Sequence, residues 1–220
     1  MRKIVLGLFT ALLAAGCGSS TKLSLSTRAS TATAAGALTA GGGVDVTRVR
    51  IVVERIKLEA AGSRSVDSSG DASEDEIVNG PFLLDLKDAA LAGGITQVFE
   101  VDAKPGTYKN LKFKLHKLSG GDPQFPGMAD LSIAIEGTIG TRSFTFTSKV
   151  DGEQEPIVGT FTISDGTANN VTLSIDPSGW FVKDGTLLDP TVEANRPEIE
   201  NNIKASFKAF DDDDRNGKHD

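Results

Sequence analysis

Residues 104–115 read KPGTYKNLKFKL, and this stretch has the clearest strand pattern in the chain. A Pro-Gly pair near its start indicates a turn. After the turn, Leu111, Phe113 and Leu115 alternate with polar residues, and a period of two is typical of a strand with one buried face. The stretch therefore predicts a half-buried β-strand that faces a hydrophobic core.

The longest strand candidate lies upstream, over residues 44–59. Val49, Ile51 and Val53 share one parity, and the apolar positions then continue on the other parity. Because the alternation of a pleated strand is strict, this change of phase predicts a β-bulge near residues 54–55.

Further strand candidates follow at short intervals, about nine in all, and this spacing favours a sandwich or a barrel. Two pairs of neighbouring candidates are joined by short turns and predict hairpins, namely 131–135 with 144–146 and 157–163 with 171–175. We therefore expect an all-β protein, an antiparallel β-sandwich of immunoglobulin- or transthyretin-like type.

One domain over residues 22–210 accounts for these strands, with loops expected at 28–43 and 62–79. Residues 195–210 are the one helix candidate. Asn195 is placed to cap the helix, and apolar residues follow at helical spacing from Ile199 to Phe210. We expect this short C-terminal helix to pack on a sheet.

The chain begins MRKIVLGLFTALLAAGC, with two basic residues and then an apolar run of about a dozen residues, as signal peptides have. The run ends at Cys17, and residues 13–17 resemble the lipobox of bacterial lipoproteins, although Ala14 stands where a large aliphatic residue is usual. The resemblance implies removal of residues 1–16 and acylation of Cys17, with 17–21 as a tether. An ordinary secretory peptide is the alternative.

Cys17 is the only cysteine, so an internal disulfide framework is excluded and a hydrophobic core must stabilise the domain. Removal of Arg2 and Lys3 changes the formal net charge from −7 to −9. This acidic balance argues against nucleic acid as a partner. The lipid is the expected attachment to the membrane.

Trp180 and Phe181 form the one conspicuous aromatic pair. An exposed pair of this kind binds sugar rings by stacking, whereas a buried pair closes the end of a sandwich core. We favour the core role and retain ligand binding by Trp180 and Phe181 as the alternative.

The chain ends in an acidic segment, residues 211–220, which contains the pattern D-x-D-x-N-G-x-x-D. The pattern is similar to the calcium loops of EF-hand, dockerin and thrombospondin type 3 repeats, in which alternate side-chain oxygens and one backbone carbonyl bind the ion. It predicts Ca²⁺ as a possible cofactor. The bidentate acid at the twelfth place is missing, and a solvated acidic tail is the alternative. The expected ligands are Asp212, Asp214, Asn216, Lys218 through its carbonyl, and Asp220.

No residue pattern predicts catalysis. Cys17 is not available as a nucleophile when acylated, and His116 and His219 are the only histidines. His116 lies on the polar face of its strand without an acidic neighbour in that strand, so we expect an exposed surface histidine. Hydrolysis by an acidic pair stays possible in principle, but nothing in the sequence selects a pair.

Together, the lipobox-like cysteine, the 44–59 strand and the KPGTYKNLKFKL stretch resemble an uncharacterised family of bacterial lipoproteins whose domains are similar to transthyretin or carboxypeptidase-regulatory β-sandwiches. The resemblance implies a non-enzymatic binding or structural module, held by its lipid in the cell envelope. Gly18, rather than aspartate, after Cys17 implies the outer membrane, facing either the periplasm or the exterior. A carbohydrate-binding or adhesive lipoprotein, with a glycan or protein partner, is the alternative, and a hydrolase is the third.

Overall fold

The protein is mostly β-structure, and its only α-helix among the described residues is short and near the C-terminus. This confirms the predicted all-β class. The computed structural model describes residues 21–30, 38–40, 42–61, 75–156 and 159–220. The expected signal peptide, Cys17 and residues 18–20 lie outside them. In the described part, no helix has the length and apolar character needed to cross a bilayer.

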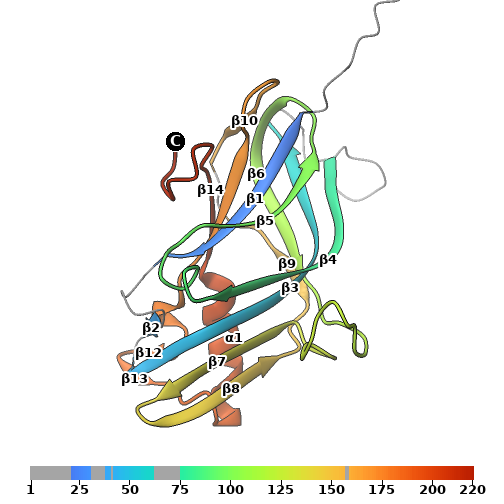
Figure 1. Cartoon of the computed structure of the whole chain (residues 1–220). Coiled ribbons are helices and arrows are strands. Elements are labelled where there is room, and N and C mark those ends of the chain that lie inside the picture. The colour runs from blue at the N-terminus through green and yellow to red at the C-terminus, as the bar shows by residue number, and fades with distance from the viewer. Residues whose placement is uncertain (1–20, 31–37, 41, 62–74, 157–158) are drawn as a thin grey trace, which may run out of the picture.

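Strand β3 (Val44–Ala60) is the centre of the larger sheet (Figure 1). One edge of β3 pairs first with β7 and then with β6, and its other edge pairs with β2 and β4. Three further strands extend the sheet, since β8 pairs with β7, and β9 and β10 pair with β6. The bounds are β2 Leu38–Ala40, β4 Asp75–Lys87, β6 Gly106–Leu115, β7 Ile133–Ile139, β8 Arg142–Ser148, β9 Gly152–Gln154 and β10 Phe161–Ile163.

The smaller sheet has the order β14-β11-β1-β5. Its central pair, β1 and β11, is parallel, whereas the two outer pairings are antiparallel. A two-stranded ribbon of β12 and β13 stands apart from both sheets. The bounds are β1 Lys22–Ala29, β5 Thr96–Asp102, β11 Asn170–Ile175, β12 Val182–Lys183, β13 Thr186–Leu187, α1 Arg196–Ala205 and β14 Phe207–Asp211.

Both sheets contribute to one hydrophobic core, which explains why so many strands bury every second side chain. The predicted inward residues Leu111, Phe113 and Leu115 of β6 are all buried in it. The predicted bulge is also confirmed, because the register of β3 with β4 and with β6 shifts between Val53 and Arg55.

Four expectations about secondary structure were wrong. The first is the second hairpin, because β10 pairs with β6 in the larger sheet while β11 pairs with β1 in the smaller one. The turn at residues 164–169 therefore connects the two sheets. The second is the purely antiparallel arrangement, since β1 and β11 run parallel.

The third is the extent of the helix, which ends at Ala205, so that residues 207–211 form β14 instead. Phe207 is buried, and the pairing of β14 with the buried strand β11 favours the extended form over a longer helix. Asn195 makes no capping bond with its side chain, which donates to the Asp189 carbonyl instead.

The fourth concerns the two loops. The expected loop at 28–43 contains the end of β1 and the short strand β2, and strand β4 begins at Asp75, inside the expected loop at 62–79. In both places, pairing with β3 or with β11 holds small or polar residues in strands that their composition does not predict.

Candidate metal site in the C-terminal segment

The C-terminal segment, residues 211–220, is folded onto the smaller sheet (Figure 1). It leaves β14 and turns back toward β1. There, the guanidinium of Arg215 donates to Ser24 Oγ at 2.9 Å, and Arg28 Nη1 donates to the Gly217 carbonyl at 2.7 Å. These two contacts fasten the segment to the strand that follows the tether, so the alternative of a solvated tail does not describe this structure.

The backbone of the segment adopts the turns expected of a D-x-D-x-N-G loop. The Gly217 N–H donates to the Asp212 carboxylate at 3.1 Å, and the Asn216 N–H donates to Asp214 Oδ1 at 3.0 Å. The Lys218 N–H donates to Asn216 Oδ1 at 2.8 Å. Gly217 has a φ of +81°, which a residue with a Cβ adopts only at a cost.

Asp212 has a different role from the one predicted, because its carboxylate faces the sheet. The residue has 0% of its surface exposed, and Thr172 Oγ1 donates to its Oδ2 at 2.6 Å. Its carbonyl accepts from Asn170 Nδ2 at 2.8 Å, and Ser26 Oγ donates to Asn170 Oδ1 at 2.7 Å. A buried polar network therefore joins the segment to β11 and β1, and Asp212 is part of that network.

The carboxylates that come together are those of Asp211, Asp213 and Asp220, each of which offers an oxygen within 4.8 Å of the others. The Asp213 N–H donates to Asp220 Oδ2 at 2.5 Å, and the Asn170 N–H donates to Asp213 Oδ1 at 2.8 Å. We call these three residues the acidic triad. It shares only Asp220 with the predicted ligand set.

The triad has the electrostatics of a cation site. Burial, followed by the charges of Asp213 and Asp220, raises the pKa of Asp211 to about 6. Three converging carboxylates repel one another, and a hard cation would relieve that repulsion. Calcium takes oxygen ligands of this kind, so the residues present fit a divalent cation.

Apart from Asp220, the ligands that the sequence pattern predicts are not the acids that converge in this structure. Strand β14 ends at Asp211, and residues 212–215 form a turn in which the Arg215 N–H donates to the Asp212 carbonyl at 3.0 Å, so the acidic side chains do not alternate as they would along a strand. Asp212 fits the calcium-loop pattern, but its carboxylate is buried against the sheet, where Thr172 Oγ1 donates to it. Of the other predicted ligands, Asp214, Asn216 and Lys218 are exposed.

Trp180 and Phe181 lie in the core and are both 0% exposed, as the favoured interpretation predicted. The Phe181 ring makes an edge contact with Phe144 at 5.6 Å between centroids. Neither ring offers a face on which a sugar could stack, so the ligand-binding alternative for this pair was wrong.

The sequence predicted an exposed surface histidine at position 116. In the structure, His116 is half-buried and lies beside two acidic side chains. Its Nδ1 lies 3.8 Å from Glu54 Oε2 and 3.7 Å from Asp151 Oδ2. Lys114 Nζ lies between the same two acids, 2.7 Å from Glu54 and 3.3 Å from Asp151, and its hydrogen bond lowers the pKa of Glu54. Glu54 belongs to β3 and Lys114 to β6, while His116 follows the end of β6 and Asp151 precedes β9, so a search within one strand misses this cluster.

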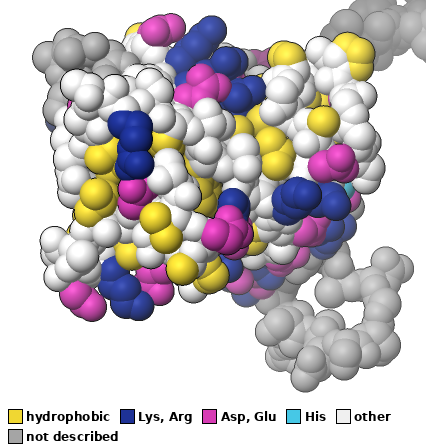
Figure 2. Space-filling view, turned by 90° about the horizontal axis from the view of Figure 1, so that it is seen from below, with side chains coloured by type: hydrophobic (Ala, Val, Ile, Leu, Met, Phe, Trp, Pro, Cys, Tyr) yellow, Lys and Arg dark blue, Asp and Glu magenta, His cyan; other side chains and the backbone are white. Residues whose placement is uncertain are grey.

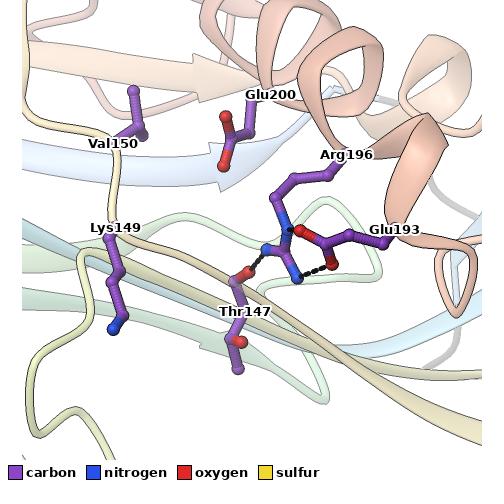
Figure 3. A pocket seen from close by; sticks show the side chains of 6 residues that line it. All are labelled: Thr147, Lys149, Val150, Glu193, Arg196 and Glu200. Atoms are coloured by element: carbon purple, nitrogen blue, oxygen red, sulfur yellow. Dashed lines mark hydrogen bonds and ion pairs between the residues drawn. The ribbon is translucent and has the colours of Figure 1, made fainter.

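A pocket of about 490 Å³ opens where the N-terminal turn of α1 faces the end of β8 (Figure 3). Its lining residues are Thr147, Lys149, Val150, Glu193, Arg196 and Glu200. The pocket contains two carboxylates, as hydrolysis by an acidic pair requires. However, Arg196 binds both oxygens of Glu193, at 2.7 and 2.9 Å, and lowers its pKa, whereas a general acid needs a raised one.

Comparison with known proteins adds little to these observations. No family model matches the chain, and no curated protein matches it. Among solved structures, the chain is similar to MbnP from Methylosinus trichosporium, with 12% sequence identity and a TM-score of 0.38. The likeness covers 88% of this chain and 98% of that chain. At that identity and TM-score, it assigns neither a family nor a function to this chain.

Proposed function

We propose that this chain is a lipid-anchored protein of the bacterial envelope, a non-enzymatic binding or structural module whose C-terminal segment is clasped to the smaller sheet by Ca²⁺. The convergence of Asp211, Asp213 and Asp220 is the observation that carries the calcium part. The pattern of residues 1–17 supports the anchor.

Calcium suits the triad better than a transition metal. The three donors are all carboxylate oxygens, whereas zinc and copper sites are richer in imidazole and thiolate. Three carboxylates leave room for water in a shell of six to eight oxygens, which is the ordinary number for Ca²⁺. Such an incomplete set matches the weak sites of extracellular modules, with dissociation constants of roughly 10⁻⁴–10⁻³ M.

Calcium at the triad would act on several strands of the smaller sheet. Asp211 belongs to β14, and Asp213 is bonded to β11 through Asn170. The same segment reaches β1 through Arg215 and Arg28. A bound ion would therefore connect three of the four strands of this sheet, including the strand that begins next to the tether.

Isothermal titration of the full mature chain with CaCl₂ tests this proposal, using Cys17→Ser to leave the protein unacylated. We expect saturable binding in the range above, with loss of most of it in Asp213→Asn, since the amide keeps the acceptor for Asn170 and removes the charge. The matched control is Glu153→Gln, which removes an exposed charge from β9. Equal binding heat in Asp213→Asn and Glu153→Gln would contradict the proposal.

A further inference from the structure

Thr21, the first described residue of the chain, is fixed in place rather than trailing from the domain. It is 8% exposed, and its hydroxyl donates to the Asp165 carboxylate. The Ala103 N–H donates to its carbonyl at 2.9 Å. The point where the tether meets the domain is therefore held between two turns, residues 103–105 and residues 164–169.

These two turns lie at the same end of the molecule, which we call the tether end (upper end in Figure 1). The β7–β8 turn at Gly140 and Thr141 and the α1 pocket lie at the opposite end, which we call the far end. Figure 2 shows the far end, where basic and acidic side chains are intermixed.

The length of the tether limits how far the tether end stands from the lipid. Three residues lie between Cys17 and Thr21, and the four Cα–Cα steps across them span at most about 14 Å when fully extended. The polar headgroup layer on each side of a bilayer is itself roughly 5–8 Å thick. With an acylated Cys17 at the edge of the hydrocarbon, the turns beside Thr21 have to lie at or close to the headgroups.

We propose that the tether end docks against the lipid headgroups and that the far end, with the α1 pocket, points away from the membrane. This inference rests on the lipid anchor proposed above. The occupant of the tether end is the bilayer surface itself. Charges of both signs lie there, with an ion pair between Lys22 and Asp102 and with Lys104 and Asp165 on the two turns, and the acidic triad is bonded to Asn170 next to the second turn. The tether, rather than attraction to anionic lipid, therefore sets the orientation.

Spin labels at the two ends test this orientation in the full-length acylated protein in phosphatidylcholine vesicles. Acylation blocks the thiol of Cys17, the only cysteine, so Ala168→Cys and Thr141→Cys each provide one reactive thiol on an exposed turn residue. A nickel-chelating lipid then relaxes labels that lie near the headgroups. We expect a relaxation enhancement several-fold larger at residue 168 than at residue 141, unchanged when phosphatidylglycerol is added.

Equal enhancement at the two positions, or the larger value at residue 141, overturns the orientation. Lys104→Cys on the neighbouring turn provides a second tether-end label if Ala168→Cys fails to fold. Flotation of the protein with vesicles, compared with Cys17→Ser, separates the two proposals. Protein that floats only with Cys17 intact but shows the wrong label pattern refutes the docking alone, whereas flotation that does not depend on Cys17 refutes the anchor and the docking with it.

Discussion

Asp212→Ala separates a structural role for this residue from the ligand role that its sequence pattern predicts. The Asp212 carboxylate is fully buried and accepts from Thr172 Oγ1 at 2.6 Å and from the Gly217 N–H at 3.1 Å. Alanine leaves both donors without this acceptor. We therefore expect Asp212→Ala to destabilise the fold even when no calcium is present.

The magnitude follows from the two hydrogen bonds. Each bond to an ionised acceptor contributes about 1.5–3 kcal/mol, so the loss of two gives about 3 kcal/mol or more in the free energy of unfolding. For a chain of this length, 1 kcal/mol shifts the melting temperature by roughly 2–4 °C, so a loss of 3 kcal/mol or more predicts a decrease of at least about 6–12 °C. The matched control Asp214→Ala removes an exposed carboxylate bonded only within the loop, and we expect a decrease of about 2 °C or less.

Thermal unfolding followed by circular dichroism, in EDTA and in millimolar CaCl₂, measures both variants. Asp212→Ala is expected to lose a similar amount of stability in the two buffers. If Asp212→Ala and Asp214→Ala unfold at the same temperature in EDTA, the buried network does not stabilise the fold as described. If the loss appears only in CaCl₂, Asp212 is a ligand after all.

Three other predictions concern the same fold. Asp211 has a pKa of about 6 in the folded protein against an ordinary 3.8, so without a cation the protein loses stability as pH rises from about 4 to 6. Asp211→Asn should remove this loss, which is worth about 1–2 kcal/mol at pH 7 after allowance for partial exposure. Urea unfolding at several pH values measures it, and a loss of equal size in Asp211→Asn would contradict the prediction. Gly217→Ala places a Cβ against Arg28 Nη1 at a φ of +81°, so limited proteolysis should cut the C-terminal segment faster than in wild type, and an unchanged rate would refute the close approach. Trp180→Ala should cost about 3–5 kcal/mol in urea unfolding, against about 0.5 kcal/mol or less for the exposed Val192→Ala, and a small effect of the former would place Trp180 outside the core.

The alternation of apolar and polar residues predicted the strands that bury one face in the hydrophobic core. It located β6, and its change of phase located the bulge in β3 at the right residues. Patterning along the chain does not show which sheet a strand joins. The turn at 164–169 looks like a hairpin locally, but the pairing of β11 with β1, about 145 residues away along the chain, determines its real role.

The candidate metal site was predicted as a region but not as a set of residues. A spacing motif assumes that the loop is independent of its surroundings. Here β14 extends to Asp211, and the Asn170 and Thr172 side chains of β11 bind the next residue, Asp212. These contacts hold the Asp212 carboxylate against the sheet, whereas the Asp213 carboxylate lies beside those of Asp211 and Asp220. The role of Asp212 depends on where β11 lies, and the spacing of residues 211–220 does not show this.

Hydrogen–deuterium exchange of the backbone amides of residues 211–220, in the full mature chain with and without CaCl₂, tests the central claim most directly. The proposed clasp predicts that the amides of Asp213 and Gly217, which donate to Asp220 and Asp212, are protected in EDTA and become several-fold more protected when calcium is added. Exchange of these amides at the rate of an unstructured peptide, unchanged by calcium, would contradict both the clasp and its metal.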